Sequence, residues 1–357
     1  MKKHRKLLMA PIALVLLIAA AAIMVVPKLY QSAPERKRFD ASFLELFDTV
    51  SVIDGYDLSK EAFAAFSQEV HDTLLVYHYL YDIYHENGVE ASIQTINDNA
   101  GIKPVPVDRR IIDLLKMSKE VYELTDGETN VAFGAVLRIW HDYREAGIDD
   151  PENASLPPMD ELREAAKHTD IDDVIIDEAA GTVYLTDPEM SLDVGSVGKG
   201  YATEQMAQII EASGRTNVLL SIGGNVRAVG AKPDGTPWFI GIENPDKDAE
   251  EKKLFTINID GLSVVTSGAY NRYYTVDGQI YHHIIDPDTL MPAAYFASVV
   301  IVAKDSGLAD GLSTALFCMP LEEGKRLVES LDHTNACWVL KDGTVEMTDG
   351  FRLLIKK

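Results

Sequence analysis

Cysteine and basic residues are scarce in this sequence, and each shortage excludes a class of function. Only two of the 357 residues are cysteine, Cys318 and Cys337, and their separation fits neither a zinc site nor a redox pair. The 33 Lys and Arg residues are outnumbered by 56 Asp and Glu residues, which gives a net charge of −23. Such a surface repels polyanions, so nucleic acid is not the expected ligand.

Internal repeats and low-complexity tracts are also absent from the sequence. The 46% hydrophobic and 25% charged content is that of a globular protein, which excludes a disordered chain and a polytopic membrane protein. Both cysteines are expected to be structural. In an oxidising compartment they can pair or stay as separate buried thiols, and the sequence leaves both possibilities open.

Basic charge is concentrated at the N-terminus, in front of one long apolar run. Residues 7–27 offer about 20 apolar residues, enough to cross a hydrocarbon core of roughly 30 Å. The basic residues 1–6 predict a cytoplasmic N-terminus and an extracytoplasmic remainder at the cell membrane. We expect a single-pass transmembrane anchor; a cleaved signal peptide, with alanines at 19–22 near the cleavage point, is the alternative. Residues 28–38 are then a linker and residues 39–357 the folded domain.

The pattern of the remaining chain predicts an α+β fold with mainly antiparallel sheets. From about residue 171, short β-branched runs are separated by Gly, Asp and Pro, which is typical of strands and turns. Apolar residues recur at helical spacing in several other segments. The stretch Asp142 to Pro158, rich in Asp, Glu and Pro, is expected to be a loop. The predicted helices are 59–86, 108–124, 199–213, 308–318 and 321–331.

Residues 191–210, SLDVGSVGKGYATEQMAQII, are the first segment with chemical potential. A short strand is expected to end at Asp193, followed by a glycine-rich turn and a helix. The glycines let backbone amides approach a phosphate, and Lys199 adds a positive charge. The spacing does not match a nucleotide-binding phosphate loop. A plain joint between strand and helix is an equally good explanation for this segment taken alone.

Two further segments predict hairpins. Residues 217–230 contain Gly223-Gly224, and residues 264–293 contain Asp277-Gly278, both favourable pairs for two-residue turns. The second segment continues into HHIIDP. Because successive strand residues point to opposite faces, only one of its two histidines can face a given site.

Residues 306–320, SGLADGLSTALFCMP, predict a helix with oxygen-bearing side chains on one face. Asp310, Ser313 and Thr314 lie three and four positions apart and therefore share that face. Carboxylate and hydroxyl oxygens are ligands that Mg²⁺ prefers. The alternative is an aspartate placed near the helix N-terminus for its favourable interaction with the helix dipole.

Taken in order, LDVGSVGKGYA, SIGGN, TSGAYNRYY…HHIIDP and LADGLSTALF resemble the ApbE family of flavin transferases. Members of this family move FMN from FAD onto a Ser or Thr of another protein. The resemblance begins near FDTV at residues 47–50 and continues to about Pro320. It implies a T-fold-like α+β core of tandem antiparallel sheet-and-helix lobes, with FAD in the cleft between them.

The resemblance also implies roles for individual residues. Asp193, Lys199 and Ile285 match positions that bind FAD, and Ala132, Phe133 and Gly134 fall in an FAD-contacting loop. His283 matches the position of the family histidine and is the candidate base, whereas His282 is expected to be structural. The implied Mg²⁺ ligands are the main-chain carbonyl of Ser196 and the side chains of Asp310, Ser313 and Thr314.

Two departures from the family pattern are Asn225, in place of a frequent Asp, and Leu290, in place of a frequent Gly. Both are expected to alter loop geometry more than chemistry. The implied activity is Mg²⁺-dependent FMN transfer to an extracytoplasmic flavoprotein of an electron-transfer chain. FAD hydrolysis to FMN and AMP, or metal-free storage of FAD by a surface protein, are the alternatives.

Overall fold

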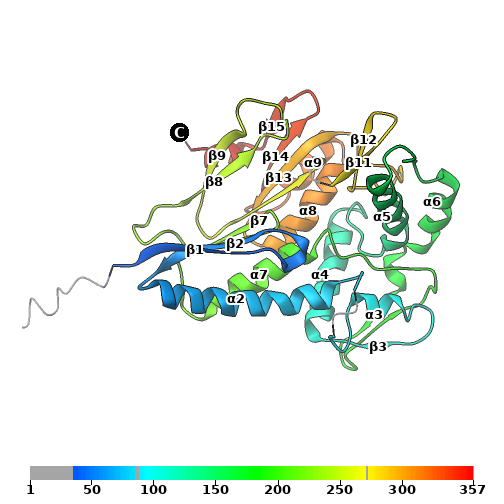
Figure 1. The fold of residues 1–357 in the computed structure, drawn as a ribbon, viewed down its shortest axis with the longest axis horizontal. Coiled ribbons are helices and arrows are strands. Elements are labelled where there is room, and N and C mark those ends of the chain that lie inside the picture. The colour runs from blue at the N-terminus through cyan, green and yellow to red at the C-terminus, as the bar shows by residue number, and fades with distance from the viewer. Residues whose placement is uncertain (1–34, 86–87, 271, 357) are drawn as a thin grey trace, which may run out of the picture.

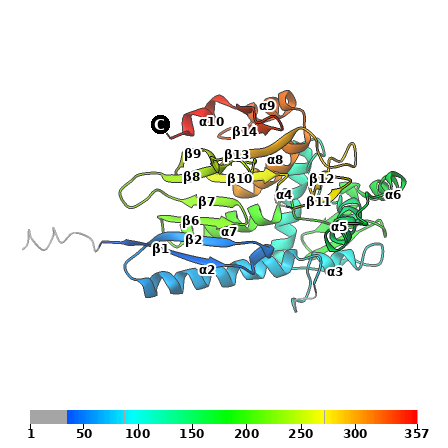
Figure 2. The ribbon, with the colours of Figure 1, turned by 45° about the horizontal axis from the view of Figure 1, so that its top comes forward.

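An eight-stranded antiparallel sheet forms the centre of the protein, and the order of its strands follows in Figure 2. The computed structural model describes residues 35–85, 88–270 and 272–356. In spatial order the strands are β1 (Lys37–Phe43), β2 (Ser51–Asp57), β6 (Val218–Ile222), β7 (Asn225–Val229), β10 (Ser263–Gly268), β13 (Phe296–Ala303), β14 (Asn335–Leu340) and β15 (Val345–Met347). The predicted α+β class with mainly antiparallel sheets is confirmed.

Helices and three small sheets surround the central sheet (Figure 1). The helices are α2 (Lys60–Tyr81), α3 (Ile93–Asn97), α4 (Arg109–Leu124), α5 (Gly134–Asp149), α6 (Met159–Ala165), α7 (Gly198–Ala212), α8 (Ser306–Cys318), α9 (Leu321–Glu329) and α10 (Asp349–Leu354). The small sheets are β3 (Val105–Pro106) with β5 (Thr182–Leu185) and β4 (Val174–Asp177), β8 (Trp238–Glu243) with β9 (Lys253–Ile259), and β11 (Tyr273–Val276) with β12 (Gln279–His282).

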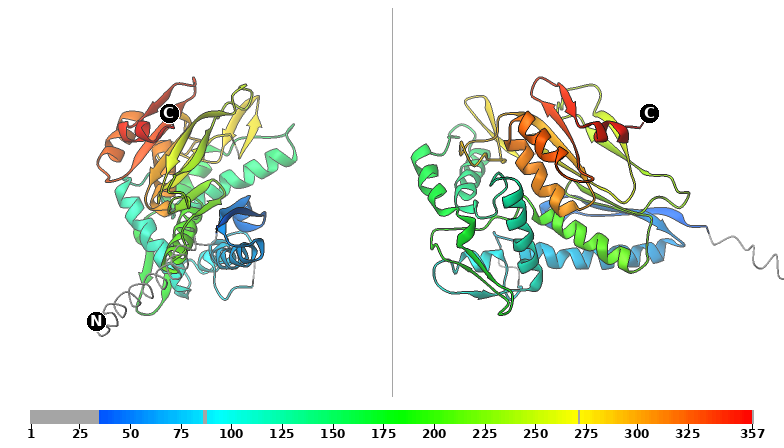
Figure 3. Two further views of the ribbon diagram at one scale, coloured as in Figure 1. Left: turned by 90° about the vertical axis from the view of Figure 1, so that its left-hand side faces the viewer. Right: turned by 180° about the vertical axis from the view of Figure 1, so that it is seen from behind.

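Both faces of the central sheet are covered. Along β13, Val299 and Ile301 pack into a core with α8, while Val300 and Val302 pack into a second core with β8, β9 and α10. This alternation is that of successive strand residues. Helices α2, α7 and α8 lie together on one side, as the view from behind in Figure 3 shows.

The tandem lobes implied by the family resemblance share this single sheet. Strands β1, β2, β6 and β7 form one half and β10, β13, β14 and β15 the other, and the halves join through pairing of Val264 with Val226. Helix α7 packs on the first half and α8 on the second. The contact between α7 and α8 therefore bridges the two halves.

Both predicted hairpins are present, whereas two segments differ from expectation. Gly223-Gly224 and Asp277-Gly278 join their strands with positive φ angles at all four residues. Helix α2 ends at Tyr81, before the predicted residue 86. The expected loop at 142–158 is helical as far as Asp149, because α5 extends its buried face through Trp140 and Gly147. Acidic residues on the exposed face of α5 had suggested a loop.

The N-terminal predictions fall mainly outside the described residues. The anchor or signal at residues 7–27 lies there entirely, and the ranges from residue 35 onward contain no helix long and apolar enough to cross a membrane. Strand β1 begins at Lys37, two residues before the expected start of the domain. The end of the predicted linker is therefore part of the sheet, where Arg38 forms an ion pair with Asp54.

The two cysteines are free and buried. Cys318 belongs to the core between the sheet and α8, whereas Cys337 belongs to the core on the opposite face of the sheet. The sheet separates the two thiols, so they do not pair.

Candidate active site

A cleft of about 1000 Å³ brings together most of the residues singled out in the sequence. Its walls come from the turn before α7, one side of α8, the loop after α4, strand β8 and the segment around β11 and β12. This volume is at the upper end of the range for small-molecule sites. The predicted site residues that line it are Phe133, Asp193, Ser196, Lys199, His283, Ile285, Asp310 and Thr314.

The glycine-rich turn before α7 is held by its own polar contacts. Asp193 Oδ1 accepts a hydrogen bond from Gly195 N at 2.8 Å, and Lys199 Nζ donates to Gly195 O at 3.0 Å. Burial raises the pKa of Asp193, against the opposing effects of the amide and of Lys199. The turn therefore presents a lysine, an aspartate and the N-terminus of a 15-residue helix to the cleft.

Asp310 faces this turn from α8. Its Oδ2 accepts from Gly200 N at 2.8 Å and from Asn225 Nδ2 at 3.2 Å, and Lys199 Nζ lies 3.8 Å away. Burial raises the pKa of Asp310, whereas these three groups favour its ionised form. All three contacts fall on Oδ2, and Oδ1 makes no hydrogen bond with the described residues. Oδ1 is the oxygen left for a ligand.

The other predicted oxygen ligands on α8 divide into two kinds. Thr314 lines the cleft, one helical turn after Asp310. Ser313 is fully buried, and its hydroxyl donates to Asp310 O at 2.9 Å. Its oxygen lies 2.8 Å from Ser267 Oγ, which must then be the donor. Ser313 does not line the cleft. Its hydroxyl instead connects the backbone at Asp310 with Ser267 on β10.

The two adjacent histidines point in different directions. His282 is buried: its Nε2 lies 3.0 Å from Ala293 O, and its Nδ1 accepts from Ile284 N at 3.2 Å. His283 lines the cleft, with Nδ1 3.1 Å from Arg272 O. Because a carbonyl can only accept, His283 Nδ1 carries the proton and Nε2 keeps a lone pair.

Neutral imidazole is strongly favoured at His283. Burial, with a further contribution from the Arg272 charge, lowers its pKa to about 3. The ring stays neutral across the physiological range and has one nitrogen able to accept a proton.

One of the three residues in the predicted FAD-contacting loop lines the cleft. Phe133 lines the cleft, but Ala132 and Gly134 do not. A Cβ atom on Gly134 would lie 2.3 Å from Ser191 O, so this glycine allows close packing of the backbone. The remaining lining of this loop is supplied by Glu128, Thr129 and Asn130.

Glu128 is a cleft residue that sequence reasoning missed. Its Oε2 is buried and has no hydrogen-bond partner among the described residues. Burial and the nearby charges of Asp286 and Asp288 raise its pKa to about 7. A carboxyl group in the cleft therefore changes charge near neutral pH. Nothing in the sequence marked it, because its environment comes from a segment more than 150 positions away.

Several cationic and aromatic residues at the cleft were also missed, because they are far apart in the sequence. Arg144 Nη2 lies 2.8 Å from His141 Nδ1, and the His141 ring stacks on Tyr84 at 4.8 Å between centroids. Lys247 Nζ lies 4.3 Å from the centre of the Tyr270 ring. The cleft thus places basic side chains beside acidic ones that include Asp193 and Asp310.

The oxygen ligands in the cleft fit Mg²⁺ only if phosphate oxygens of the substrate complete its coordination. No three His, Cys, Asp or Glu side chains within residues 35–85, 88–270 and 272–356 form a group that could hold a metal ion. The predicted donors that line the cleft are Asp310, whose Oδ1 is free, the Thr314 hydroxyl and the main chain of Ser196. Protein sites for Mg²⁺ commonly use one or two carboxylates together with phosphate oxygens of the substrate. The residues present fit that arrangement.

Comparison with known proteins identifies the family. The model of the ApbE family matches residues 47–338. The chain belongs to the ApbE family. It is 30% identical to the FAD:protein FMN transferase of Klebsiella pneumoniae (strain 342), over 76% of this chain and 82% of that protein. It is 32% identical to the FAD:protein FMN transferase of Treponema pallidum (strain Nichols), over 74% and 75%.

The fold agrees with this assignment. The crystal structure of the ApbE protein from Thermotoga maritima superposes with a TM-score of 0.78 at 29% identity, covering 90% of this chain and 100% of that one.

The two departures from the ApbE pattern have structural consequences. Asn225 donates to the Asp310 carboxylate, so it bears directly on the proposed ligand and not only on loop geometry. An aspartate there would place a second carboxylate beside Asp310. Leu290 adopts φ 60°, a conformation that favours glycine. Its carbonyl accepts a hydrogen bond from Trp140 Nε1 at 2.9 Å, which helps to hold this loop against α5.

Proposed function

We propose that this ApbE family member transfers FMN from FAD to a Ser or Thr hydroxyl of an acceptor protein and releases AMP. The observation that carries the proposal is that Lys199, His283 and Asp310, from three distant segments, line one cleft. The names of the relatives, FAD:protein FMN transferases, support the same chemistry.

In this reaction the acceptor oxygen forms a bond to the FMN phosphorus of FAD. The bond from that phosphorus to the bridging oxygen breaks, and AMP leaves with the electron pair. His283 is the proposed acceptor of the hydroxyl proton at Nε2, since its Nδ1 is held as a donor by Arg272 O. Lys199 and the amides of the turn before α7 would interact with the pyrophosphate; the hydrogen bond of Lys199 to Gly195 O, which holds the ammonium group at this turn, supports that role.

The residues that would hold Mg²⁺ are Asp310 through Oδ1, Thr314 through its hydroxyl and Ser196 through its main chain. When bound there, the ion would neutralise negative charge on the pyrophosphate. Phe133 and Ile285 supply apolar surface in the same cleft, suited to the ring systems of FAD.

We further propose that the enzyme is anchored in the cell membrane by residues 7–27 and acts outside the cytoplasm. The support is the length of the apolar run and the basic residues before it. The acceptor would then be an exported or membrane-bound protein, and anchoring would concentrate both on one plane. An electron-transfer subunit with a Ser or Thr modification site is the proposed partner.

Product analysis tests the proposed activity. The enzyme is incubated with FAD, Mg²⁺ and a Thr-bearing acceptor peptide of the kind the family modifies, and the products are weighed by mass spectrometry. We expect AMP and a flavinylated peptide. AMP with free FMN would instead assign the alternative, FAD hydrolysis, and unchanged FAD would assign a binding protein. The variant Asp310→Asn keeps an acceptor for Gly200 N but loses the charge, and should lose most of the turnover.

A further inference from the structure

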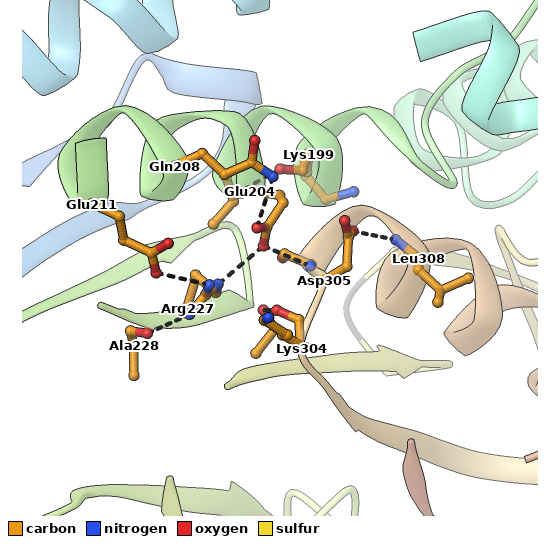
Figure 4. Close-up of polar contacts among 12 residues, drawn as sticks. Lys199, Glu204, Gln208, Glu211, Arg227, Ala228, Lys304, Asp305 and Leu308 are labelled. Carbon is orange, nitrogen blue, oxygen red and sulfur yellow. Dashed lines mark hydrogen bonds and ion pairs between the residues drawn. The ribbon is translucent and has the colours of Figure 1, made fainter. Parts of the chain in front are cut away.

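A buried ion pair lies between β7, α7 and the first residue of α8, the helix that carries Asp310. Arg227, on β7, and Glu204, on α7, have side chains only 2% and 7% exposed, and Arg227 Nε donates to Glu204 Oε2 at 3.0 Å. Figure 4 shows the pair between α7 and the start of α8. Charges buried to this degree persist only where hydrogen bonds and an opposite charge compensate them.

Both carboxylate oxygens of Glu204 and all three guanidinium nitrogens of Arg227 make hydrogen bonds. Glu204 Oε1 accepts from Gln208 Nε2 at 3.1 Å. Arg227 Nη2 donates to Glu211 Oε1 at 3.1 Å, and its Nη1 donates to Ala228 O. The planar guanidinium thus ties one strand to two turns of α7, a geometry that lysine cannot reproduce. Figure 4 marks these contacts as dashed lines.

Glu204 also holds the first residue of α8. Its Oε2 accepts from Ser306 N at 3.1 Å. This N–H is one of the amides at a helix start that have no partner within the helix. A carboxylate there also interacts favourably with the helix dipole. The acceptor comes from another helix, so the contact fixes where α8 begins relative to α7.

Two contacts one turn apart set the register of the helices. Gly200 N donates to Asp310 Oδ2, and four residues later along α7 Glu204 accepts from Ser306, four residues before Asp310. Such four-residue steps keep both contacts on one face of each helix. At Gly200 the backbones are so close that a Cβ atom would lie 2.3 Å from Ser306 O.

We propose that Glu204 and Arg227 are positioning residues for a divalent cation. They lock α8 against α7 and so hold Asp310 and Thr314 at the glycine-rich turn. Neither side chain lines the cleft. This inference rests on the proposed function for the identity of the ligand residues. It adds two residues from outside the cleft that determine metal affinity.

The test is equilibrium binding of Mn²⁺ to the full-length protein, followed by the electron paramagnetic resonance of free Mn²⁺. ADP is present, because it carries a pyrophosphate but no flavin to transfer. The double variant Glu204→Leu with Arg227→Met removes the ion pair and the contact of Glu204 with Ser306 N. It leaves neither charge buried alone, so it should fold. Arg227→Lys is a milder change. Glu211→Gln is the matched control, since this partner of Arg227 is 46% exposed.

We expect the double variant to bind Mn²⁺ about tenfold more weakly, at the low end of the effect of residues behind metal ligands. Arg227→Lys should lose less, and Glu211→Gln should stay within about twofold of the wild type. The Mg²⁺ concentration for half-maximal turnover should rise in parallel, with little change in KM for FAD at saturating Mg²⁺.

A lowered Tm with unchanged Mn²⁺ affinity would mean that the pair only stabilises the fold, and the inference would be wrong. It would also be wrong if the wild type did not bind Mn²⁺. Failure of the proposed function is a different result: normal Mn²⁺ binding by the wild type, weakened binding by the double variant and no AMP formed from FAD.

Discussion

At the scale of single residues, the two neighbouring histidines should separate catalysis from stability. His283→Asn should slow transfer by roughly 10² to 10⁴-fold, because the proposed proton acceptor Nε2 is lost. FAD affinity should change little. His282→Asn is the matched control: it breaks buried hydrogen bonds and should lower the free energy of unfolding by about 1–3 kcal/mol while the folded fraction keeps its rate. Single-turnover flavinylation and thermal unfolding measure the two effects.

The pH profile gives a further check on His283. Since its pKa is lowered to about 3, the ring is already neutral at pH 5.5 and its own titration should not shape the rate between pH 5.5 and 8.5. Equal rates for His283→Asn and the wild type would assign the base to another group, with Asp286 the next candidate.

Glu128 should instead make FAD binding depend on pH. Its pKa is raised to about 7, above the value of an unfolded chain, so the neutral form is favoured in the folded protein and is lost as pH rises through about 7. The resulting carboxylate repels the FAD phosphates, and an effect of about 1 kcal/mol, roughly fivefold in Kd, is expected between pH 6 and 8. Flavin fluorescence titrations at each pH measure it.

Glu128→Gln should remove this dependence and bind FAD at pH 8 as the wild type does at pH 6. The free energy of unfolding of the wild type should also fall with rising pH, because the favourable contribution of the neutral Glu128 carboxyl is lost as pH rises through about 7. Glu145→Gln, on the exposed side of α5, is the control and should leave the profile unchanged. A pH-dependent Kd that survives in Glu128→Gln would contradict the assignment.

At the scale of elements, the crossing of α7 and α8 depends on one glycine. In Gly200→Ala the new Cβ atom would meet Ser306 O at 2.3 Å and Asp310 Cβ at 2.4 Å. The helices must separate, and we expect the free energy of unfolding to fall by about 1–3 kcal/mol together with a loss of transfer activity. Chemical denaturation and product analysis on the same samples measure both.

Gly198→Ala, two residues earlier in the same helix, is the matched control for stability, whereas Gly198 itself lines the cleft and is no control for activity. Its Cβ would meet Tyr81 at 3.4 Å, an ordinary contact, and alanine favours the helix by up to about 1 kcal/mol. If Gly200→Ala were as stable as Gly198→Ala, the close approach of the helices would not matter for the fold.

The same elements show what the sequence can and cannot predict. The hairpins at Gly223-Gly224 and Asp277-Gly278 were predicted because their turns need positive φ angles that the local residues supply. The oxygen-bearing face of α8 followed from helical spacing. The ion pair of Arg227 with Glu204 joins positions 23 apart on a strand and a helix, and no local pattern encodes it.

Errors in the prediction have the same origin. Residues 142–158 were expected to form a loop because they are rich in Asp, Glu and Pro, but α5 continues to Asp149 and packs Gly147 against Tyr274. Ser313 was expected beside the metal from helical spacing and from the family resemblance, whereas its hydroxyl contacts Ser267 on β10, 46 residues earlier, and does not line the cleft. Tertiary contacts thus decide which side of an element faces the cleft.

At the scale of the whole molecule, the cleft carries charges of both signs. The chain has a net charge of −23, and the cleft is lined by Lys199, Lys247, Arg144 and Arg272 together with acidic side chains that include Glu128, Asp193 and Asp310. An anionic substrate therefore depends on the placement of individual cations, such as Lys199 at the glycine-rich turn, and not on the net charge of the cleft.

The last prediction concerns where the molecule resides. If residues 7–27 anchor an exported domain, protease added to intact cells should release a fragment that begins between residues 28 and 36, because strand β1 starts at Lys37 and is protected by pairing with β2. Because residues 7–27 are the proposed attachment to the membrane, this fragment should leave the membrane fraction with its FMN transfer activity intact. N-terminal sequencing and a flavinylation assay of the released material test both points. A protein in the medium that begins soon after residue 20 would favour the cleaved signal, and resistance to protease until the cells are lysed would contradict export.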